Sequence, residues 1–107
     1  MLTIEEFSKV ELRVGTVLAA ENHPNADRLL VLRVDLGSEV RQIVAGIRAH
    51  YRPEELVGRQ IVVVANLQPA TLRGVESQGM LLAASDEDGN LAILTPDRPV
   101  RPGARVR

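Results

Sequence analysis

The fold is decided by Ile61 to Ala84, which reads I-V-V-V-A-N-L-Q-P-A-T-L-R-G-V-E-S-Q-G-M-L-L-A-A. Its first part, Ile61 to Val64, is β-branched throughout and predicts a buried strand. Met80 to Ala84 predicts the neighbouring strand. Between the two runs, Asn66 to Met80 holds small polar residues, a proline and two glycines. A β scaffold can hold donors rigidly toward a ligand at such a joint, so this segment is the first place to look for function.

Further strands are expected on both sides of this stretch. Apolar and polar residues alternate in the two segments before it, and a third short apolar run precedes a glycine. The predicted strands are Val10 to Ala20, in which Gly15 marks a bulge or a sharp bend, Leu30 to Leu36, and Arg41 to Ala45. After it, the turn Asp86 to Asn90 predicts a hairpin that returns through Leu91 to Leu94, followed by an extended, irregular tail with three prolines.

Two short helices complete the pattern. Thr3 and Glu6 have the spacing of a capping box, which predicts a helical turn from Ile4 to about Ser8, with Phe7 fixing it to the core. Pro53 opens a second short helix, since proline suits a first helical position and acidic residues suit the first turn. Short strands with a helix after the third predict an all-β fold, a five-stranded Greek-key OB-fold barrel with extra C-terminal strands. Residues 1–107 form one domain, since 107 residues support one core.

Composition excludes several classes of protein. Cysteine is absent, which excludes disulfides and thiolate metal sites and fits a reducing cytoplasm. The acidic N-terminus does not resemble a signal peptide, and no apolar run approaches the ~18 residues of a membrane span, so no membrane partner is expected. A net charge of −1 argues against coating nucleic acid by bulk electrostatics. All cations except Lys9 are arginines, which suit forked contacts to phosphate, although genome composition or thermal adaptation explains them equally well.

Catalytic and metal motifs fail on spacing. Gly74 to Gly79 has the spacing G-x-x-S-x-G, whereas a nucleophile elbow needs G-x-S-x-G, and Met80 stands where a P-loop requires lysine. Asp86 to Asp88 lacks the later bidentate glutamate of a calcium loop and is interpreted as a solvated turn. His23 and His50 have no partners at ligand spacing and are interpreted as loop histidines. We therefore expect no enzyme activity, no metal and no cofactor.

Binding of RNA fits the residues better. Phe7 and Tyr51 are the only aromatic residues, so stacking of a general single strand is disfavoured. What remains is recognition of a folded surface through arginines, backbone donors and small polar groups, as structured RNA is read through its shape, phosphates and 2′-hydroxyls.

A resemblance to a known family supports this hypothesis. Six segments of the chain occur in the same order in one family: F-S-K-V-E-L-R-V-G (7–15), H-P-N-A-D-R-L (23–29), I-V-A-G-I (43–47), P-E-E-L-V-G (53–58), V-V-A-N-L (63–67) and G-V-E-S-Q-G-M (74–80). By these segments the chain is identified as a member of the tRNA-binding OB-fold domains. It most resembles the free-standing bacterial tRNA-binding proteins and the C-terminal appendix of bacterial methionyl-tRNA synthetases.

The resemblance implies a set of tRNA contacts. Ser77, Met80, Asn66 and Arg28 stand at the family's candidate contact positions. Ser77 and Asn66 would donate to phosphate or 2′-hydroxyl, Arg28 would fork onto phosphate, and Met80 would offer a soft surface. Core packing explains Met80 equally well, and Asn66 equally suits a turn.

Charge is sparse around these positions. Relatives often carry basic residues between the asparagine and the first glycine of this segment, whereas here Arg73 is alone, which predicts weaker and less salt-sensitive binding. Arg33 and Arg41, on the adjoining strands, are further candidates, and each is equally well explained as a solvated strand residue.

The resemblance also implies how the domain works. It predicts a cytoplasmic homodimer that binds the folded body of tRNA with little regard for the anticodon and has no chemistry of its own. A synthetase catalytic domain is a further expected partner, in cis or in trans, and any methionine activation would lie outside this chain. The extended tail after Thr95 is the expected dimer surface. The alternative function is a protein-binding, chaperone-like OB module related to secretion chaperones.

Overall fold

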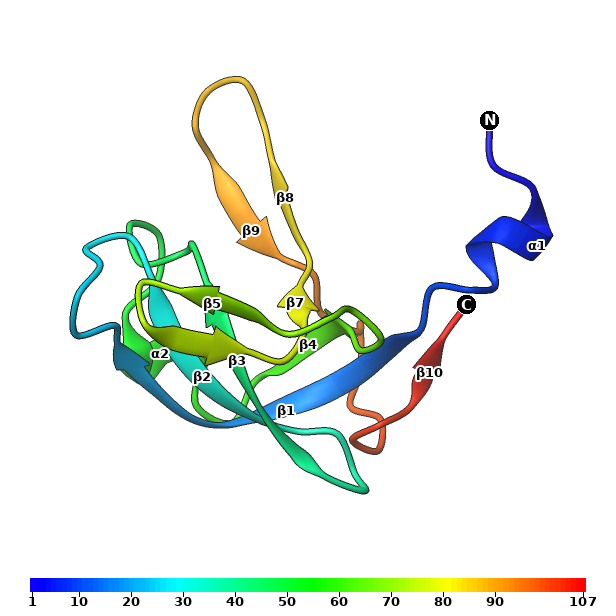
Figure 1. Cartoon of the computed structure of the whole chain (residues 1–107), viewed down its shortest axis with the longest axis horizontal. Coiled ribbons are helices and arrows are strands. Elements are labelled where there is room, and N and C mark those ends of the chain that lie inside the picture. The colour runs from blue at the N-terminus through cyan, green and yellow to red at the C-terminus, as the bar shows by residue number, and fades with distance from the viewer.

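A computed structural model describes residues 1–107. Two short helices and ten strands follow one another along the chain (Figure 1). The helices are α1 (Ile4–Phe7) and α2 (Pro53–Leu56). The strands are β1 (Leu12–Asn22), β2 (Leu30–Asp35), β3 (Val40–Ala45), β4 (Gln60–Val64), β5 (Ala70–Leu72), β6 (Val75–Ser77), β7 (Met80–Leu81), β8 (Ala83–Ser85), β9 (Leu91–Ile93) and β10 (Arg105–Val106). No helix is both long and apolar enough to cross a membrane.

The main sheet is the predicted OB barrel. Its strands run antiparallel in the order β3-β2-β1-β4-β7, with β10 added beside the start of β1. The long strand β1 makes the barrel possible, because its first half pairs with β4 and its second half with β2. The hairpins β5–β6 and β8–β9 lie outside this sheet, and Figure 1 shows β8–β9 standing away from the barrel. The prediction of an all-β OB fold with extra C-terminal strands is confirmed.

Strand β1 bends where its sequence combines a small residue with a bulge. The register with β2 shifts between Val17 and Ala19. Gly15, where the bulge was expected, has another role, since a Cβ there would lie 2.3 Å from Cγ1 of Val34. The bulge therefore lies at Leu18, and Gly15 allows β1 and β2 to approach closely.

Backbone and side-chain hydrogen bonds help to close the barrel between β3 and the segment around β6. The backbone N–H of Gln78 donates to the carbonyl of Gln42 over 2.8 Å, and Gln42 N–H donates to Oε1 of Gln78 over 3.0 Å. Leu30, Leu32, Ile43, Leu56 and Ile61 are fully buried inside. Leu56 is the one buried residue of α2, so this helix plugs the barrel with a single leucine.

The N-terminal helix departs from the expectation. The capping box is present, with Thr3 Oγ1 accepting from Glu6 N–H and Glu6 Oε1 accepting from Thr3 N–H, both over 3.1 Å. However, α1 buries no residue, Phe7 is partly exposed, and the helix projects away from the barrel (Figure 1). The prediction that Phe7 fixes this helix to the core is wrong, because α1 finds no surface of its own chain to pack on.

Candidate nucleic-acid interface

One end of the barrel combines two loops and the outer face of two strands. OB folds bind oligonucleotides on the face of their second and third strands and on the flanking loops. The first of these loops joins β1 to β2, and the second runs from Asn66 through the β5–β6 hairpin to Gly79. The two loops meet at His23, whose ring contacts the carbonyl of Leu72. Three of the predicted site residues, Arg28, Arg33 and Arg73, are carried by these elements.

These three arginines are exposed and take part in no ion pair. Arg28 lies near the end of the β1–β2 loop, and Arg33 points outward from β2 in register with Ala19 and Gln42. Arg73 occupies the tip of the β5–β6 hairpin. An exposed guanidinium without a carboxylate partner is available for phosphate, and its fork suits two phosphate oxygens at once.

Arg73 stands in a backbone conformation that side chains rarely adopt. Its φ is +52° and that of Gly74 is +88°, while Leu72 and Val75 pair directly. This is a two-residue hairpin turn with both central residues left-handed, a turn in which asparagine followed by glycine is favoured. Backbone strain of this kind concentrates at functional positions. The strained arginine therefore strengthens the hairpin tip as a candidate contact.

A cavity of mixed polar and apolar lining lies on the same face. It holds about 220 Å³ and is lined by Ala19, Ala20, Glu21, Val31, Arg33 and Gln42. The lining includes the carboxylate of Glu21 as well as the guanidinium of Arg33, so an anion in this cavity would be repelled by one and attracted by the other. The cavity suits a sugar or a base edge better than a phosphate alone.

Ser77 is buried and already has both of its hydrogen-bond partners. Only 4% of the residue is exposed. Its Oγ accepts from the backbone N–H of Val44 over 2.9 Å and donates to the carbonyl of Gly79 over 2.8 Å. The hydroxyl has no proton left for RNA. Ser77 therefore closes the barrel, and its influence on a ligand would pass through the backbone it holds.

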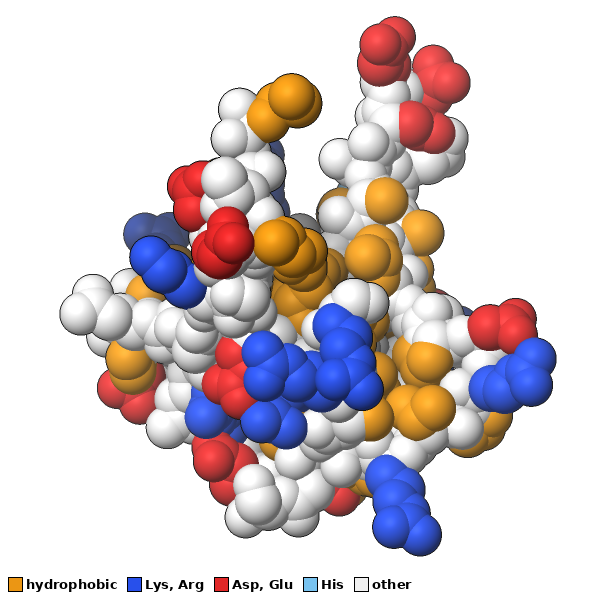
Figure 2. All heavy atoms as spheres, turned by 90° about the vertical axis from the view of Figure 1, so that its right-hand side faces the viewer, with side chains coloured by type: hydrophobic (Ala, Val, Ile, Leu, Met, Phe, Trp, Pro, Cys, Tyr) orange, Lys and Arg blue, Asp and Glu red, His pale blue; other side chains and the backbone are white.

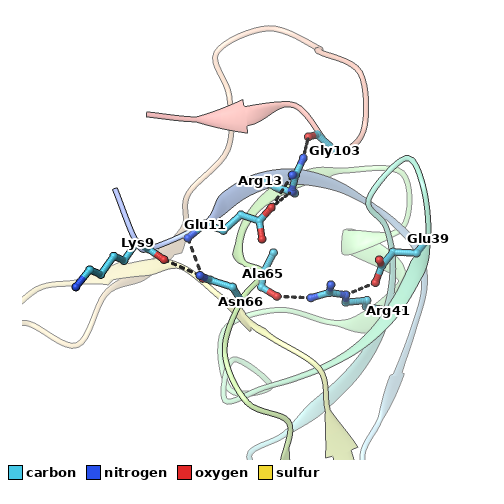
Figure 3. Close-up of polar contacts among 8 residues, drawn as sticks. All are labelled: Lys9, Glu11, Arg13, Glu39, Arg41, Ala65, Asn66 and Gly103. Atoms are coloured by element: carbon cyan, nitrogen blue, oxygen red, sulfur yellow. Dashed lines mark hydrogen bonds and ion pairs between the residues drawn. The ribbon is translucent and has the colours of Figure 1, made fainter. Parts of the chain in front are cut away.

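Asn66 also acts inside the protein (Figure 3). Its Oδ1 accepts from Glu11 N–H over 2.8 Å, and its Nδ2 donates to the carbonyl of Lys9 over 2.6 Å. These two bonds fasten the segment before β1 to the end of β4. The sequence indicated a polar residue at this joint but not its partners, which lie more than fifty positions earlier in the chain.

Arg41 is held by three acceptors, of which Figure 3 shows Glu39 and Ala65. Its Nε pairs with Glu39, and its Nη1 donates to the carbonyls of Ala65 and, over 3.3 Å, Gln78. The hydrogen bond and the charge of Arg41 lower the pKa of Glu39 below its ordinary value. This guanidinium joins β3 to the ends of β4 and β6, so it is not free as Arg28, Arg33 and Arg73 are.

Met80 borders an apolar cavity. It is 48% exposed, which removes the interpretation that it only packs in the core. The cavity holds about 290 Å³ and lies between the end of β3 and β7, lined by Val44, Ala45, Gly46, Ile47, Met80, Leu81, Leu82 and Ala83. A methionine at the rim of such a cavity offers a polarizable, adaptable surface.

Sequence reasoning missed His23 as part of the site. It was interpreted as a loop histidine, yet it is 3% exposed and both ring nitrogens have partners. The signal that could have found it is its place at the head of the H-P-N-A-D loop. No group of three or more histidine, aspartate or glutamate side chains in residues 1–107 could hold a metal ion.

Residues 12–105 match the family described as "Putative tRNA binding domain". The chain belongs to this tRNA-binding domain family. The match runs from the start of β1 into β10, so it includes the barrel, both loops and the two outer hairpins. The resemblance drawn from six sequence segments is thereby confirmed.

Related proteins are methionine–tRNA ligases. The chain is 63% identical over 105 residues to the enzyme of Thermotoga maritima and 57% identical over 106 residues to that of Thermococcus kodakarensis. These alignments cover 98% and 99% of this tRNA-binding domain but only 16% and 14% of the ligases. The chain thus spans about one seventh of the length of the relatives it matches.

Solved structures share the whole fold. A methionyl-tRNA-synthetase-related protein from Pyrococcus horikoshii superposes with a TM-score of 0.94 and 42% identity, covering 100% of this chain and 98% of that one. The chaperone CsaA of Bacillus anthracis superposes with a TM-score of 0.90 and 33% identity, covering 100% and 99%. The fold is therefore shared by proteins named for different roles.

Proposed function

We propose that this chain is a cytoplasmic tRNA-docking module that binds the folded body of several tRNAs and has no chemistry of its own. The observation that carries the proposal is the set of three exposed, unpaired arginines on the two loops and the β2 face of an OB barrel. Phosphate contacts of this kind position an RNA without reading its sequence. Binding should therefore depend on tRNA shape more than on the anticodon.

Gel-shift titrations with several unrelated tRNAs at low salt test this function. Arg28→Ala should weaken every tRNA by about 1 kcal/mol or more, since a charge-assisted bond to phosphate is lost. Arg59→Ala removes the same charge from an exposed residue outside the two loops, the arm and the tail, and serves as the matched control. Absence of tRNA binding by the unaltered chain would contradict the proposal.

The module is proposed to work as a homodimer, and the N-terminal arm, residues 1–10, supports this. Met1, Leu2, Ile4, Phe7 and Val10 are all exposed apolar residues of this arm. Figure 2 shows further hydrophobic side chains in the hollow between the arm and the β8–β9 hairpin. A contiguous exposed apolar surface of this kind marks an interaction site. The arm therefore joins the tail after Thr95 as the proposed dimer surface.

Sedimentation velocity tests the assembly. The double substitution Ile4→Asp with Phe7→Asp should convert a dimer to a monomer, since it places charges on the apolar arm without touching the barrel. Val57→Asp charges an exposed apolar residue outside the arm and should leave the mass unchanged. A monomer for the unaltered chain at micromolar concentration would count against the dimer.

A synthetase catalytic domain is the proposed further partner, in cis or in trans. Support comes from the relatives, whose methionine–tRNA ligases contain a segment similar to nearly all of this chain. In either arrangement the module would raise the local concentration of tRNA at the catalytic domain.

A second candidate function is peptide binding of the chaperone type. The apolar cavity between β3 and β7 favours it, and the similar CsaA is named a chaperone. An extended apolar peptide would place a side chain in this cavity. Competition separates the two functions, because a peptide site distinct from the RNA site survives saturation with tRNA.

A further inference from the structure

The buried ring of His23 bridges the two loops of the RNA-binding end. Its Nδ1 lies 2.9 Å from the backbone nitrogen of Asn25, in its own β1–β2 loop. Its Nε2 lies 2.9 Å from the carbonyl oxygen of Leu72, at the tip of the β5–β6 hairpin. A backbone N–H can only donate and a carbonyl can only accept, so the ring accepts at Nδ1 and donates at Nε2.

The bond to Leu72 is the tether of the hairpin tip. The base of the hairpin is fixed to β3 through Glu76, whose carbonyl accepts from Gln42 Nε2 over 2.8 Å, and through Ser77. Of residues 70–75, only Leu72 has a hydrogen bond to another part of the chain. Strand β5 buries none of its residues. Without the His23 bond, the tip would be held by its own two short strands alone, and isolated two-stranded hairpins are marginal in water.

The other loop is anchored independently. Nη1 of Arg48 donates to the carbonyl of Ala26 over 3.2 Å, and the N–H of Arg48 approaches the carbonyl of Arg28 over 3.4 Å. The β1–β2 loop is thus anchored to the segment that follows β3, and His23 links the hairpin to this anchored loop. Arg28 and Arg73, the free guanidiniums of the two loops, are placed relative to each other by this one ring.

We propose that His23 is a positioning residue for RNA, which holds the Arg73 turn at a fixed place beside the Arg28 loop. The inference rests on the proposed tRNA binding and adds that the two loops act as one preorganised surface. A loop that must be ordered during binding costs affinity, whereas a surface fixed in advance does not. His23 itself touches no RNA, since it is buried beneath the loops that do.

Two conservative substitutions of His23 distinguish the effect of its hydrogen bond to Leu72 from the effect of simply filling its buried position. The amide nitrogen of glutamine reaches the place of Nε2, so His23→Gln keeps the bond to Leu72. The amide oxygen of asparagine occupies the place of Nδ1, so His23→Asn keeps the bond to Asn25 and loses the tether. We expect His23→Gln to bind tRNA almost as the unaltered chain does. His23→Asn should bind about three- to tenfold more weakly, the cost of ordering one or two side chains and their turn.

Limited trypsin digestion tests, in the absence of RNA, whether the hydrogen bond from His23 to Leu72 holds the hairpin tip in place. Cleavage after Arg73 should be faster in His23→Asn than in His23→Gln, because the hairpin tip opens locally. His50→Asn, at an exposed loop histidine, should match the unaltered chain in both measurements. Equal tRNA affinity together with equal cleavage in the two His23 variants would overturn the inference. If the unaltered chain binds no tRNA, the proposed function fails, and the cleavage contrast alone decides whether the tether exists.

Discussion

The hydroxyl of Ser77 lies where the barrel closes, and its loss should be measured as stability. Ser77→Ala leaves the buried N–H of Val44 without its acceptor. An unsatisfied buried donor costs about 1–3 kcal/mol, and the free energy of unfolding in urea should fall by this amount. Ser85→Ala, at an exposed serine of β8, is the control and should stay within about 0.5 kcal/mol of the unaltered chain. Equal stability of both variants would contradict the role given to Ser77.

Stability and RNA affinity should change in opposite directions at Arg73. Arg73→Asn creates the asparagine–glycine pair that this turn favours, which should raise the free energy of unfolding by up to about 1 kcal/mol. The same change removes a guanidinium, so tRNA affinity should fall. The slope of log K against log salt should become shallower by the contribution of about one phosphate contact. Urea unfolding and salt titrations measure the two effects. A variant that loses both stability and affinity would show that the arginine side chain also supports the turn.

Residue chemistry was predictable, but the partners were not. The sequence indicated that Asn66, Ser77 and Arg41 are polar groups near a site, and the structure uses all three to fasten the barrel. Each donates or accepts across a separation of 24 to 57 positions. A pattern within a short window cannot identify such partners. Arg28, Arg33 and Arg73 remain candidates because they found no partner within the chain.

The turn of the β8–β9 hairpin is held together by the carboxylate of Asp86. Oδ1 of Asp86 accepts from Asp88 N–H and Asn90 N–H over 3.0 Å each, and Oδ2 accepts from Asn90 Nδ2. The side-chain bond from Asn90, its backbone bond and that of Asp88 lower the pKa of Asp86 below its ordinary value of 3.8. A lowered folded pKa contributes stability above the unfolded value, and this stability is lost as the pH falls through the folded pKa.

The turn should therefore open locally in acid, below the ordinary pKa of an aspartate. NMR chemical shifts of the backbone and side-chain amides of Asn90 during a titration measure this opening. Residue 86 cannot titrate in Asp86→Asn, so the change of the Asn90 signals should be much smaller in this variant over the same range. Because the hairpin lies outside the main sheet, the NMR signals of the barrel should not follow the pH dependence of the turn signals. Barrel and turn signals that titrate together would contradict a local opening.

Elements with a strong periodic pattern were predicted well, and those fixed by contacts or turns were not. The four long barrel strands and the Asp86 turn follow from alternation and turn chemistry. The β5–β6 hairpin was missed because Arg73 is an unusual residue for a left-handed turn position. The capping box correctly predicted that α1 is a helix, but local chemistry does not indicate what a helix packs against.

The molecule as a whole is almost neutral, with a net charge of −1, so the proposed RNA binding must rely on local charge. Each phosphate that an arginine neutralises adds about −0.7 to −0.9 to the slope of log K against log salt. The three free guanidiniums at the candidate site of one protomer give a slope of about −2 to −3. A dimer that presents both barrel ends to one tRNA doubles this value.

The slope of log K against log salt therefore distinguishes a monomer from a dimer. If the unaltered chain is the proposed dimer, it should show a slope of about −4 to −6, whereas the variant Ile4→Asp with Phe7→Asp should show about half, because its barrel end is intact but single. Filter binding across a range of salt concentrations measures both slopes, and Val57→Asp should follow the unaltered chain. A monomeric variant with an undiminished slope would mean that one protomer makes all of the phosphate contacts. In that case the partner would stabilise the arm without touching the RNA.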